Sequence, residues 1–452
     1  MTQPNLIFVF ADQLRYQATG FGGDPNARTP HLDALAQQSL CFTNAISGCP
    51  VCCPARASLL TGQYPHEHGV FMNDVCLSDD AVSLAEAFAS AGYDTAYIGK
   101  WHLDGHGRKN YIPPERRHGF QHWEVLECTH DYNHSLYYAG DDPTLRVWEG
   151  YDAAAQTRAA QAYMREHAGQ NPYALVLSWG PPHNPYDTAP EPFNAMYDPA
   201  ALTLRPNIPP EFEAQARRDL AGYYAHISAL DALVGDLLAT LDQTGDRENT
   251  VFVFWSDHGD MLGSQGQWRK QRPWEESIHV PLLIHAPGLF GAAGRQVDAL
   301  INTPDLMPTL LDLCGVAVPT TVSGDSYAAY LRGDEDAPVD AVLLACLQPF
   351  GEFTRAQHGG REYRGVRTLR YTYARDLSGA WLLLYDNLTD PFQRDNLVNL
   401  ASHAVAQAAL DAQLDRLLAL YDDEFLPGPV YVNLWDYPLD DTGTVLFTDV
   451  PS

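Results

Sequence analysis

Four short apolar runs, each followed by a polar residue of a type used in catalysis, constrain the fold of this chain most. The runs are 6–11 (LIFVFA), 95–99 (TAYIG), 174–180 (ALVLSWG) and 250–256 (TVFVFWS), and they lead into Asp12, Lys100 with His102, His183, and Asp257 with His258. Runs that are apolar on both faces are typical of strands buried between two helix layers. Because ligands of parallel α/β sheets bind beyond the carboxyl ends of the strands, we expect these polar residues to share one site.

Amphipathic stretches between the runs predict helices. Thr29-Pro30 has the pattern of an N-cap and first helical residue, and 80–91 is a second candidate. The segment 215–241 places apolar residues on one face, and Gly245 is expected to end that helix. Alternating strands and helices predict an α/β fold with a mostly parallel central sheet.

The pattern changes near residue 345. The segments 363–373 and 381–386 are predicted to pair as strands, and a helix is expected near 401–421. We therefore expect a catalytic domain over residues 1–345, a smaller α+β subdomain with an antiparallel sheet over 346–425, and an extended C-terminal tail over 426–452. The tail is expected either to reach across another subunit of a homo-oligomer or to lie on the surface.

The charge balance limits the partners. The chain has 28 Lys and Arg residues against 57 Asp and Glu residues, a formal net charge of −29. Long-range repulsion therefore excludes nucleic acid and anionic membranes as favoured partners, and a small anionic substrate is expected only where cations are concentrated. The first ten residues lack a basic region and a cleavage site, and no window approaches the ~18 apolar residues of a membrane span. We expect a cytoplasmic protein.

The eight cysteines do not indicate a small disulfide scaffold, because they are spread over 452 residues. Cys49 and Cys52 have the C-x-x-C spacing of a redox or zinc site. No second such pair is present to complete a tetrahedral zinc site. A thiol-redox or non-catalytic metal-binding protein remains an alternative hypothesis.

Residues 50–62 (PVCCPARASLLTG) resemble the signature of the type I, formylglycine-dependent sulfatases of the alkaline phosphatase superfamily. The signature is Cys-x-Pro-x-Arg followed by an apolar pair, Thr and Gly, and it is matched here at Cys52, Pro54 and Arg56. The resemblance implies an α/β/α sandwich, and a formylglycine made from Cys52 by a formylglycine-generating enzyme. Pro54 is also predicted to set the first turn of a helix with Cys52 at its N-terminus, where an anion is favoured. The alternative is that Cys52 is a buried structural thiol.

Two further segments resemble the metal-binding strands of that family. They are residues 10–13 (FADQ) and 256–259 (SDHG), with Gln13 where Asp is commoner and His258 where many relatives have Asn. The expected metal ligands are Asp12, Gln13, Cys52, Asp257 and His258. An oxygen-rich set with one nitrogen favours Ca²⁺ and leaves Mn²⁺ and Mg²⁺ open.

The catalytic residues implied by the resemblance are Cys52, Arg56, Lys100, His102, His183 and Lys270. Lys100 and His102 lie in Gly-Lys-Trp-His, His183 in Pro-His-x-Pro, and Lys270 in Trp-Arg-Lys. Lys100 is expected to contact the sulfate, His102 to act as the base that releases sulfate, and His183 with Lys270 to assist the leaving group. Arg56, Lys100 and Lys270 would concentrate positive charge in an acidic protein. Gln265 stands where relatives often have His.

The substrate is predicted less directly. Glu127, His130 and Arg108 follow the Gly-Lys-Trp-His strand, where relatives place recognition loops, and they are expected to bind substrate. Polar and aromatic residues suit a sugar, so we expect hydrolysis of a carbohydrate sulfate monoester. The rival within the superfamily is a phosphonate monoester or phosphodiester hydrolase.

Overall fold

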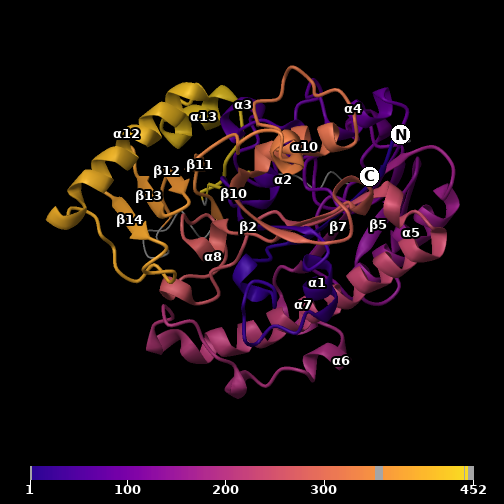
Figure 1. Cartoon of the computed structure of the whole chain (residues 1–452), viewed down its shortest axis with the longest axis horizontal. Helices are drawn as coiled ribbons and strands as arrows, with labels where there is room; N and C mark the ends of the chain where they lie inside the picture. Colours follow the sequence, from indigo (N-terminus) through magenta and orange to yellow (C-terminus); the bar gives the residue numbers. More distant parts are fainter. Residues whose placement is uncertain (1–2, 352–359, 442, 446–452) are drawn as a thin grey trace.

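The computed structural model describes residues 3–351, 360–441 and 443–445. Its main feature is a ten-stranded mixed sheet with the order β10-β2-β9-β8-β1-β7-β3-β4-β5-β6 (Figure 1). The strands are β1 (Asn5–Asp12), β2 (Leu40–Ile46), β3 (Asp94–Lys100), β4 (His122–Leu126), β5 (Leu136–Ala139), β6 (Asp142–Val147), β7 (Tyr173–Pro182), β8 (Thr250–Ser256), β9 (Leu282–His285) and β10 (Arg295–Asn302). The central strands β8, β1, β7, β3 and β4 pair in parallel, as the sequence predicted.

Strand β1 shows why the apolar runs lack alternation. Its residues alternate between two hydrophobic clusters, with Phe8 and Phe10 in one and Ile7 and Val9 in the other. Both faces of the sheet are therefore buried, and each must be apolar.

Helices cover the two faces. One layer contains α2 (Cys52–Thr61), α4 (Leu84–Ser90) and α10 (Leu306–Leu313), and the other contains α1 (Pro30–Ala36), α5 (Asp152–His167) and α7 (Glu213–Thr244). The shorter helices are α3 (Pro65–His68), α6 (Glu191–Asn194), α8 (Glu275–Ile278), α9 (Pro287–Phe290) and α11 (Ala328–Arg332). Helix α7 ends at Gly245 in the left-handed conformation, and Ser83 caps α4 through the N–H of Glu86. The predicted three-layer α/β/α arrangement is confirmed.

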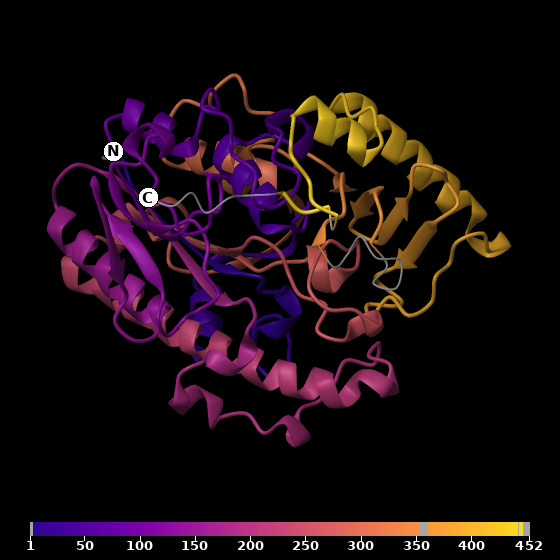
Figure 2. The same cartoon turned by 180° about the vertical axis from the view of Figure 1, so that it is seen from behind.

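The second sheet is antiparallel and has the order β11-β12-β13-β14. Its strands are β11 (Ala341–Cys346), β12 (Tyr363–Thr368), β13 (Tyr371–Arg375) and β14 (Leu382–Asp386), and α12 (Ala404–Leu420) packs on one face through Leu410, Leu414 and Leu418. The other face packs against Ile46, Ile278 and Leu300 of the larger sheet region. Figure 2 shows this small sheet and α12 beside the large sheet.

Two details differ from the expectation. Strand β11 begins at Ala341, so the small sheet starts before residue 346, while the division into domains stays a prediction. The segment 426–452 is not wholly extended, because residues 428–434 form α13 (Gly428–Leu434). Tyr431 and Val432 of α13 are buried, so tertiary packing outweighs the weak helical pattern of Gly, Pro and β-branched residues. Residues 442 and 446–452 of that segment lie outside the described residues.

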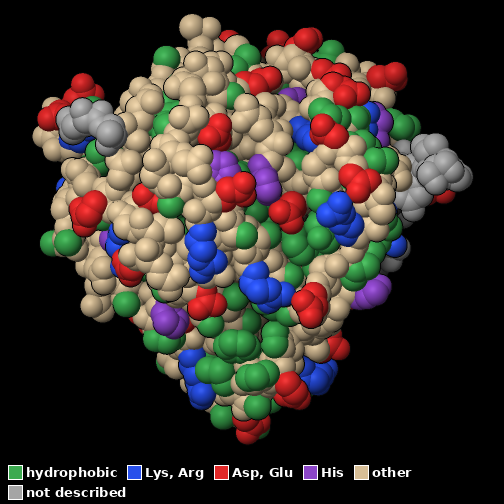
Figure 3. All heavy atoms as spheres, turned by 90° about the vertical axis from the view of Figure 1, so that its right-hand side faces the viewer, with side chains coloured by type: hydrophobic (Ala, Val, Ile, Leu, Met, Phe, Trp, Pro, Cys, Tyr) green, Lys and Arg blue, Asp and Glu red, His purple; other side chains and the backbone are tan. Residues whose placement is uncertain are grey.

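The surface charge and the length and polarity of the helices bear on possible partners. On the face drawn in Figure 3, acidic side chains are spread out with basic ones among them. In the described part of the chain, every helix is too short or too polar to cross a membrane.

Candidate active site

The carboxyl ends of neighbouring parallel strands form the floor of the site. Strands β8, β1, β7 and β3 lie side by side, and Asp257, Asp12, His183 and Lys100 stand at or just after their ends. The register pairs Ala11 with Ser256, which places the next residues, Asp12 and Asp257, beside each other. The predicted convergence of these four strands is confirmed.

Cys52 is the first residue of α2, and the whole helix is buried. The chain enters the helix through Val51 in an extended conformation and leaves it at Gly62, whose positive φ of 66° suits glycine. The N–H of Cys53 donates to Asn73 Oδ1 at 3.1 Å. The helix therefore presents Cys52 at its N-terminus toward the strand ends, where its dipole favours negative charge.

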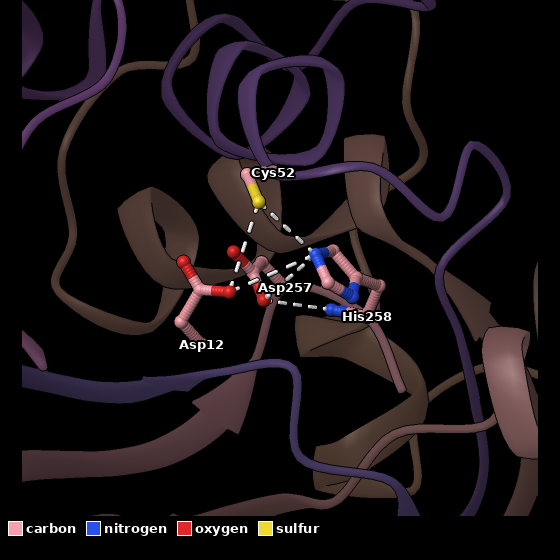
Figure 4. A group of neighbouring side chains, drawn as sticks. All are labelled: Asp12, Cys52, Asp257 and His258. Carbon is pink, nitrogen blue, oxygen red and sulfur yellow. Dashed lines mark hydrogen bonds and ion pairs between the residues drawn. The ribbon is translucent and has the colours of Figure 1, made fainter. Parts of the chain in front are cut away.

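Four side chains form a compact group in which a metal ion could bind. One ligand atom from each of Asp12, Cys52, Asp257 and His258 lies within 4.8 Å of the others, and all four residues are buried (Figure 4). Cys52 Sγ is 3.3 Å from His258 Nε2 and 3.7 Å from Asp12 Oδ1. His258 Nδ1 lies 2.9 Å from the carbonyl of Gly259, which orients Nε2 toward the group.

This donor set fits a divalent ion. Two carboxylates and one imidazole are ligands of hard to intermediate cations, and burial in the same place would be costly without a positive charge between them. Gln13 is held beside the group at a φ of 71°, with its N–H donating to Asp257 Oδ1 at 2.9 Å. Its side-chain Oε1 accepts from Lys270 Nζ at 3.0 Å, so its role as a ligand stays a prediction.

Three cations surround the acidic group. Arg56 NH2 lies 3.0 Å from Asp12 Oδ2 and 3.2 Å from Asp257 Oδ2, and Lys100 Nζ donates to Asp12 Oδ2 at 2.7 Å. Lys270 Nζ donates to Cys52 Sγ at 3.0 Å. Both terminal nitrogens of Arg56 contact protein atoms, so its guanidinium acts here on the carboxylates of Asp12 and Asp257.

The charges alter the pKa values in this group. Burial and Asp12 would raise the pKa of the Cys52 thiol, but Lys100, Lys270 and His258 outweigh them and hold it well below its ordinary value. Burial likewise opposes ionisation of Asp12, and Lys100, His183 and Arg56 overcome it, so the pKa of Asp12 is also lowered. The site is therefore organised to hold negative charge at position 52.

Position 49 differs from position 52. Burial, with a smaller effect from Cys346, raises the pKa of the Cys49 thiol far above its ordinary value. Both cysteines are free thiols. A neutral, buried partner is poorly suited to disulfide exchange, so the geometry does not favour the C-x-x-C redox hypothesis.

His102 is held by a residue that the sequence analysis missed. Its Nε2 is 3.2 Å from Asp74 Oδ1, and the same carboxylate accepts from Arg108 Nε at 2.9 Å and NH2 at 2.7 Å. Burial disfavours the charged imidazole, but Cys128, Cys53 and the hydrogen bond to Asp74 favour it and hold the pKa of His102 well above its usual value. Asp74 lies in the loop 69–83, and no motif or spacing in the sequence marks it.

The three residues predicted to contact substrate have different surroundings in the structure. Glu127 is buried and accepts hydrogen bonds from the N–H groups of Leu103, Asp104 and Gly105 at 2.9–3.2 Å, so it shapes the loop after β3 instead of facing a substrate. These bonds do not favour a substrate contact, and the role of Glu127 in substrate binding stays a prediction. Arg108 is about one-third exposed but is committed to Asp74.

His130 does lie in the site region. Its ring stacks on that of His183, with centroids 4.7 Å apart. His183 Nδ1 is 2.9 Å from the carbonyl of Asn184, and burial, Lys270 and His130 lower the pKa of His183. A neutral imidazole with Nδ1 held by a carbonyl presents Nε2 as an acceptor.

Gln265, where relatives often have His, contacts the C-terminal region. Its Nε2 donates to the carbonyls of Phe392 at 3.2 Å and Gln393 at 2.8 Å. Gln265 therefore joins the loop before Lys270 to the turn after β14.

Comparisons with known proteins show which family the chain resembles. The family model described as Sulfatase matches residues 4–316, and the model described as N-sulphoglucosamine sulphohydrolase, C-terminal, matches residues 263–419. The chain is 43% identical over 439 residues to the Ulvan-active sulfatase of Formosa agariphila, covering 96% of this chain and 85% of that protein. It is 32% identical over 458 residues to the Endo-4-O-sulfatase of Bacteroides thetaiotaomicron, covering 87% and 88%.

A solved structure shares the fold over nearly the whole length. It comes from work on the metabolism of multiple glycosaminoglycans by Bacteroides thetaiotaomicron. It superposes with a TM-score of 0.84 at 30% sequence identity, and the match covers 94% of this chain and 97% of that one.

Proposed function

The chain belongs to the sulfatase family and is a sulfuric ester hydrolase, and on that premise we propose that it removes sulfate from a carbohydrate monoester through a nucleophile made from Cys52. The observation that carries the proposal is the position of Cys52, at the buried N-terminus of α2 with Lys270 Nζ at 3.0 Å and the Asp12 and His258 side chains adjacent. The names of the relatives, Ulvan-active sulfatase and Endo-4-O-sulfatase, support a sulfated saccharide as substrate.

The nucleophile and the metal follow from the family. A formylglycine at position 52, made by a formylglycine-generating enzyme, would supply the hydroxyl that attacks sulfur. Asp12, Asp257 and His258, with Gln13 beside them, would hold a divalent ion that polarises the ester. We propose Ca²⁺, because the oxygen donors outnumber the single nitrogen, with Mn²⁺ and Mg²⁺ as the alternatives that elemental analysis would identify.

The protein's own side chains then have distinct tasks. Lys100, which is salt-bridged to Asp12, lies where it can neutralise charge on the sulfate oxygens. Lys270 stabilises negative charge at position 52 and donates a proton to the leaving oxygen, and the neutral His183 accepts a hydrogen bond at Nε2 from the alcohol that forms. His102, oriented by Asp74, removes the proton that allows sulfate to leave.

The experiment is sulfate release from a panel of sulfated oligosaccharides, including fragments of ulvan, by protein coexpressed with a formylglycine-generating enzyme. Mass spectrometry of the peptide containing residues 41–62 reports conversion of Cys52. Cys52→Ala should lower kcat by at least about 10³-fold, because no other nucleophile is present at that position. Cys314→Ser, at the C-terminal end of α10 and outside the site, is the control and should stay within about threefold of the wild type.

Two results would contradict the proposal. Sulfate release that persists in Cys52→Ala would remove Cys52 from the mechanism. Turnover of a phosphonate monoester far above that of any sulfate ester would assign the chain to the rival hydrolase activity.

A further inference from the structure

Asp260 is a fully buried carboxylate that lies two residues after His258. It lies outside the group of four side chains in which a metal ion could bind. Its side chain accepts hydrogen bonds from the end of β1, from the segment after β7, and from the loop that carries Lys270. One carboxylate therefore contacts three of the segments that build the site.

The two oxygens of Asp260 serve different partners. Oδ1 accepts from the main-chain N–H of Arg269 at 2.8 Å and of Leu262 at 3.2 Å. Oδ2 accepts from Gln13 Nε2 at 2.6 Å and from the Tyr186 hydroxyl. All four partners are donors, which suits a carboxylate because it acts as an acceptor. Oδ1 thus holds a main-chain turn, and Oδ2 holds two side chains.

The side-chain amide of Gln13 lies between Asp260 and Lys270. Its Nε2 donates to Asp260 Oδ2, and its Oε1 accepts from Lys270 Nζ at 3.0 Å. A carboxylate accepts and an ammonium group donates, so these two neighbours leave the amide one orientation. Rotation by half a turn would set the amide N–H groups against the ammonium group and the amide oxygen against the carboxylate.

The main chain of Gln13 is fixed independently of Asp260. Its N–H donates to Asp257 Oδ1 at 2.9 Å, and its carbonyl accepts from the Tyr223 hydroxyl at 2.6 Å. Its φ of 71° lies in the left-handed region, which a residue other than glycine keeps only when surrounding contacts impose it. The orientation of the amide is therefore the part of Gln13 that Asp260 determines.

The loop that carries Lys270 is tied at both neighbours of that residue. The N–H of Arg269 donates to the same buried carboxylate, and the N–H of Gln271 donates to the carbonyl of Pro50 at 3.2 Å. Both neighbours have a φ of 66°. Lys270 Nζ in turn donates to Cys52 Sγ at 3.0 Å. The carboxylate therefore fixes both the amide that accepts from Lys270 and the loop that presents Lys270.

We propose that Asp260 is a positioning residue for sulfate ester hydrolysis, which orients the Gln13 amide so that Oε1 holds the Lys270 ammonium group beside position 52. The ammonium group donates the proton that the leaving oxygen takes up, so its displacement slows the chemical step more than it weakens substrate binding. The role of Lys270 rests on the proposed function, whereas the orientation of the amide rests on the contacts alone.

Asp260→Asn changes one side of the carboxylate and keeps the other. The oxygen of the new amide can still accept from the N–H groups of Leu262 and Arg269, while its NH2 group meets Gln13 Nε2, so that two donors face each other. The Gln13 amide is then expected to rotate, which turns its NH2 group toward Lys270. With a sulfated oligosaccharide that the wild type hydrolyses, kcat should fall by roughly 10- to 100-fold and KM should stay within about threefold.

Gln13→Glu supplies the acceptor that Asp260→Asn lacks. Alone, at pH 8, the new carboxylate faces Asp260, so kcat should fall by roughly 10-fold or more and the melting temperature by roughly 2 °C or more. In the double variant the new carboxylate accepts from the new NH2 group and still offers an oxygen to Lys270. The double variant should therefore exceed Gln13→Glu by at least about fivefold in kcat and should melt at a higher temperature.

Asp231→Asn is the matched control. Asp231 is also a buried carboxylate that accepts from two main-chain N–H groups, but these belong to His31 and Leu32 at the start of α1. Its substitution should lower the melting temperature while kcat stays within about threefold of the wild type.

Four results would overturn the proposal. They are an unchanged kcat in Asp260→Asn, a rise in KM that matches the fall in kcat, an equal fall of kcat in Asp231→Asn, and a double variant no better than Gln13→Glu in kcat and melting temperature. The last comparison decides even if Asp260→Asn alone does not fold. A wild type that releases no sulfate would contradict the proposed function instead, and the melting temperatures would still test the orientation of the amide.

Discussion

Two parts of the active site are built in different ways. We call them the metal side, which contains Asp12 and Asp257, and the loop side, which contains His102 and Asp74. Asp12 and Asp257 follow adjacent parallel strands whose register is fixed by the sheet. His102 and Asp74 lie in irregular segments and both adopt positive φ, at 63° and 64°. The first pair is positioned by backbone pairing through the whole core, whereas the second is positioned by a few side-chain contacts.

This difference determines what each side tolerates. The metal side combines buried charges that neutralise one another, so removal of one leaves the others uncompensated. The loop side depends on single carboxylates that hold neighbours in place. Mutations on the metal side should therefore abolish activity in a folded protein, and mutations on the loop side should reduce activity or stability in part.

The largest effect is expected for Asp257→Asn. The amide removes one charge from the metal group and one partner of Arg56, so kcat/KM for a sulfate ester should fall by at least about 10³-fold and the metal content should decrease. Steady-state kinetics and elemental analysis measure both. Asp298→Asn, on the edge strand β10, is the control and should behave like the wild type. If Asp257→Asn kept both its activity and its metal, the charge of Asp257 would not be needed for metal binding or for catalysis.

Asp74→Asn tests the loop side. Because the carboxylate favours the protonated form of His102, its loss should lower the pKa of His102 and move the acidic limb of the kcat profile to lower pH by about one unit. The less well-oriented base should lower kcat by roughly 10- to 100-fold, with KM nearly unchanged. A pH profile measures this. Asp80→Asn, exposed in the same loop, is the control. If the kcat profile of Asp74→Asn does not shift along the pH axis, Asp74 does not set the pKa of His102 and has a structural role instead.

Glu127→Gln should affect stability more than chemistry. The glutamine offers one acceptor oxygen where the carboxylate serves three N–H groups, so the free energy of unfolding should fall by about 1–3 kcal/mol. Activity of the folded variant should stay within about threefold. Denaturant titration and kinetics separate the two, with Glu124→Gln on β4 as control. A large rise in KM at unchanged stability would restore Glu127 as a substrate contact.

The sequence placed the site residues correctly where a local apolar pattern also determines a position in the sheet. An apolar run fixes a strand, the strand end fixes a position at the sheet edge, and Asp12, Lys100, His183 and Asp257 were found together in that way. It did not find Asp74 or the main-chain hydrogen bonds of Glu127, because the partners of a loop carboxylate depend on backbone conformation that has no periodic signature. Helix α13 was missed because buried contacts of Tyr431 outweigh local propensity.

The smallest effect concerns Asp152, the first residue of α5, whose N–H donates to the carbonyl of Tyr132 in the loop that carries His130. Burial raises the pKa of its carboxyl to about 8, and Oδ1 has no partner within the described ranges. The folded state therefore keeps a proton that the unfolded state loses near pH 4, so the free energy of unfolding falls as pH rises from about 4 to 8. Asp152→Asn cannot ionise and should remove this slope.

The melting temperature of Asp152→Asn, relative to wild type, should accordingly be higher at pH 8 than at pH 5 by roughly 1–4 °C. Thermal unfolding at both pH values measures the difference. Asp142→Asn is the control, because the Asp142 side chain is about half exposed on the edge strand β6 and its pKa, lowered to about 2 by hydrogen bonds from Thr144, lies below the tested window. If both variants melt in parallel with the wild type, Asp152 does not hold a buried proton at the start of α5.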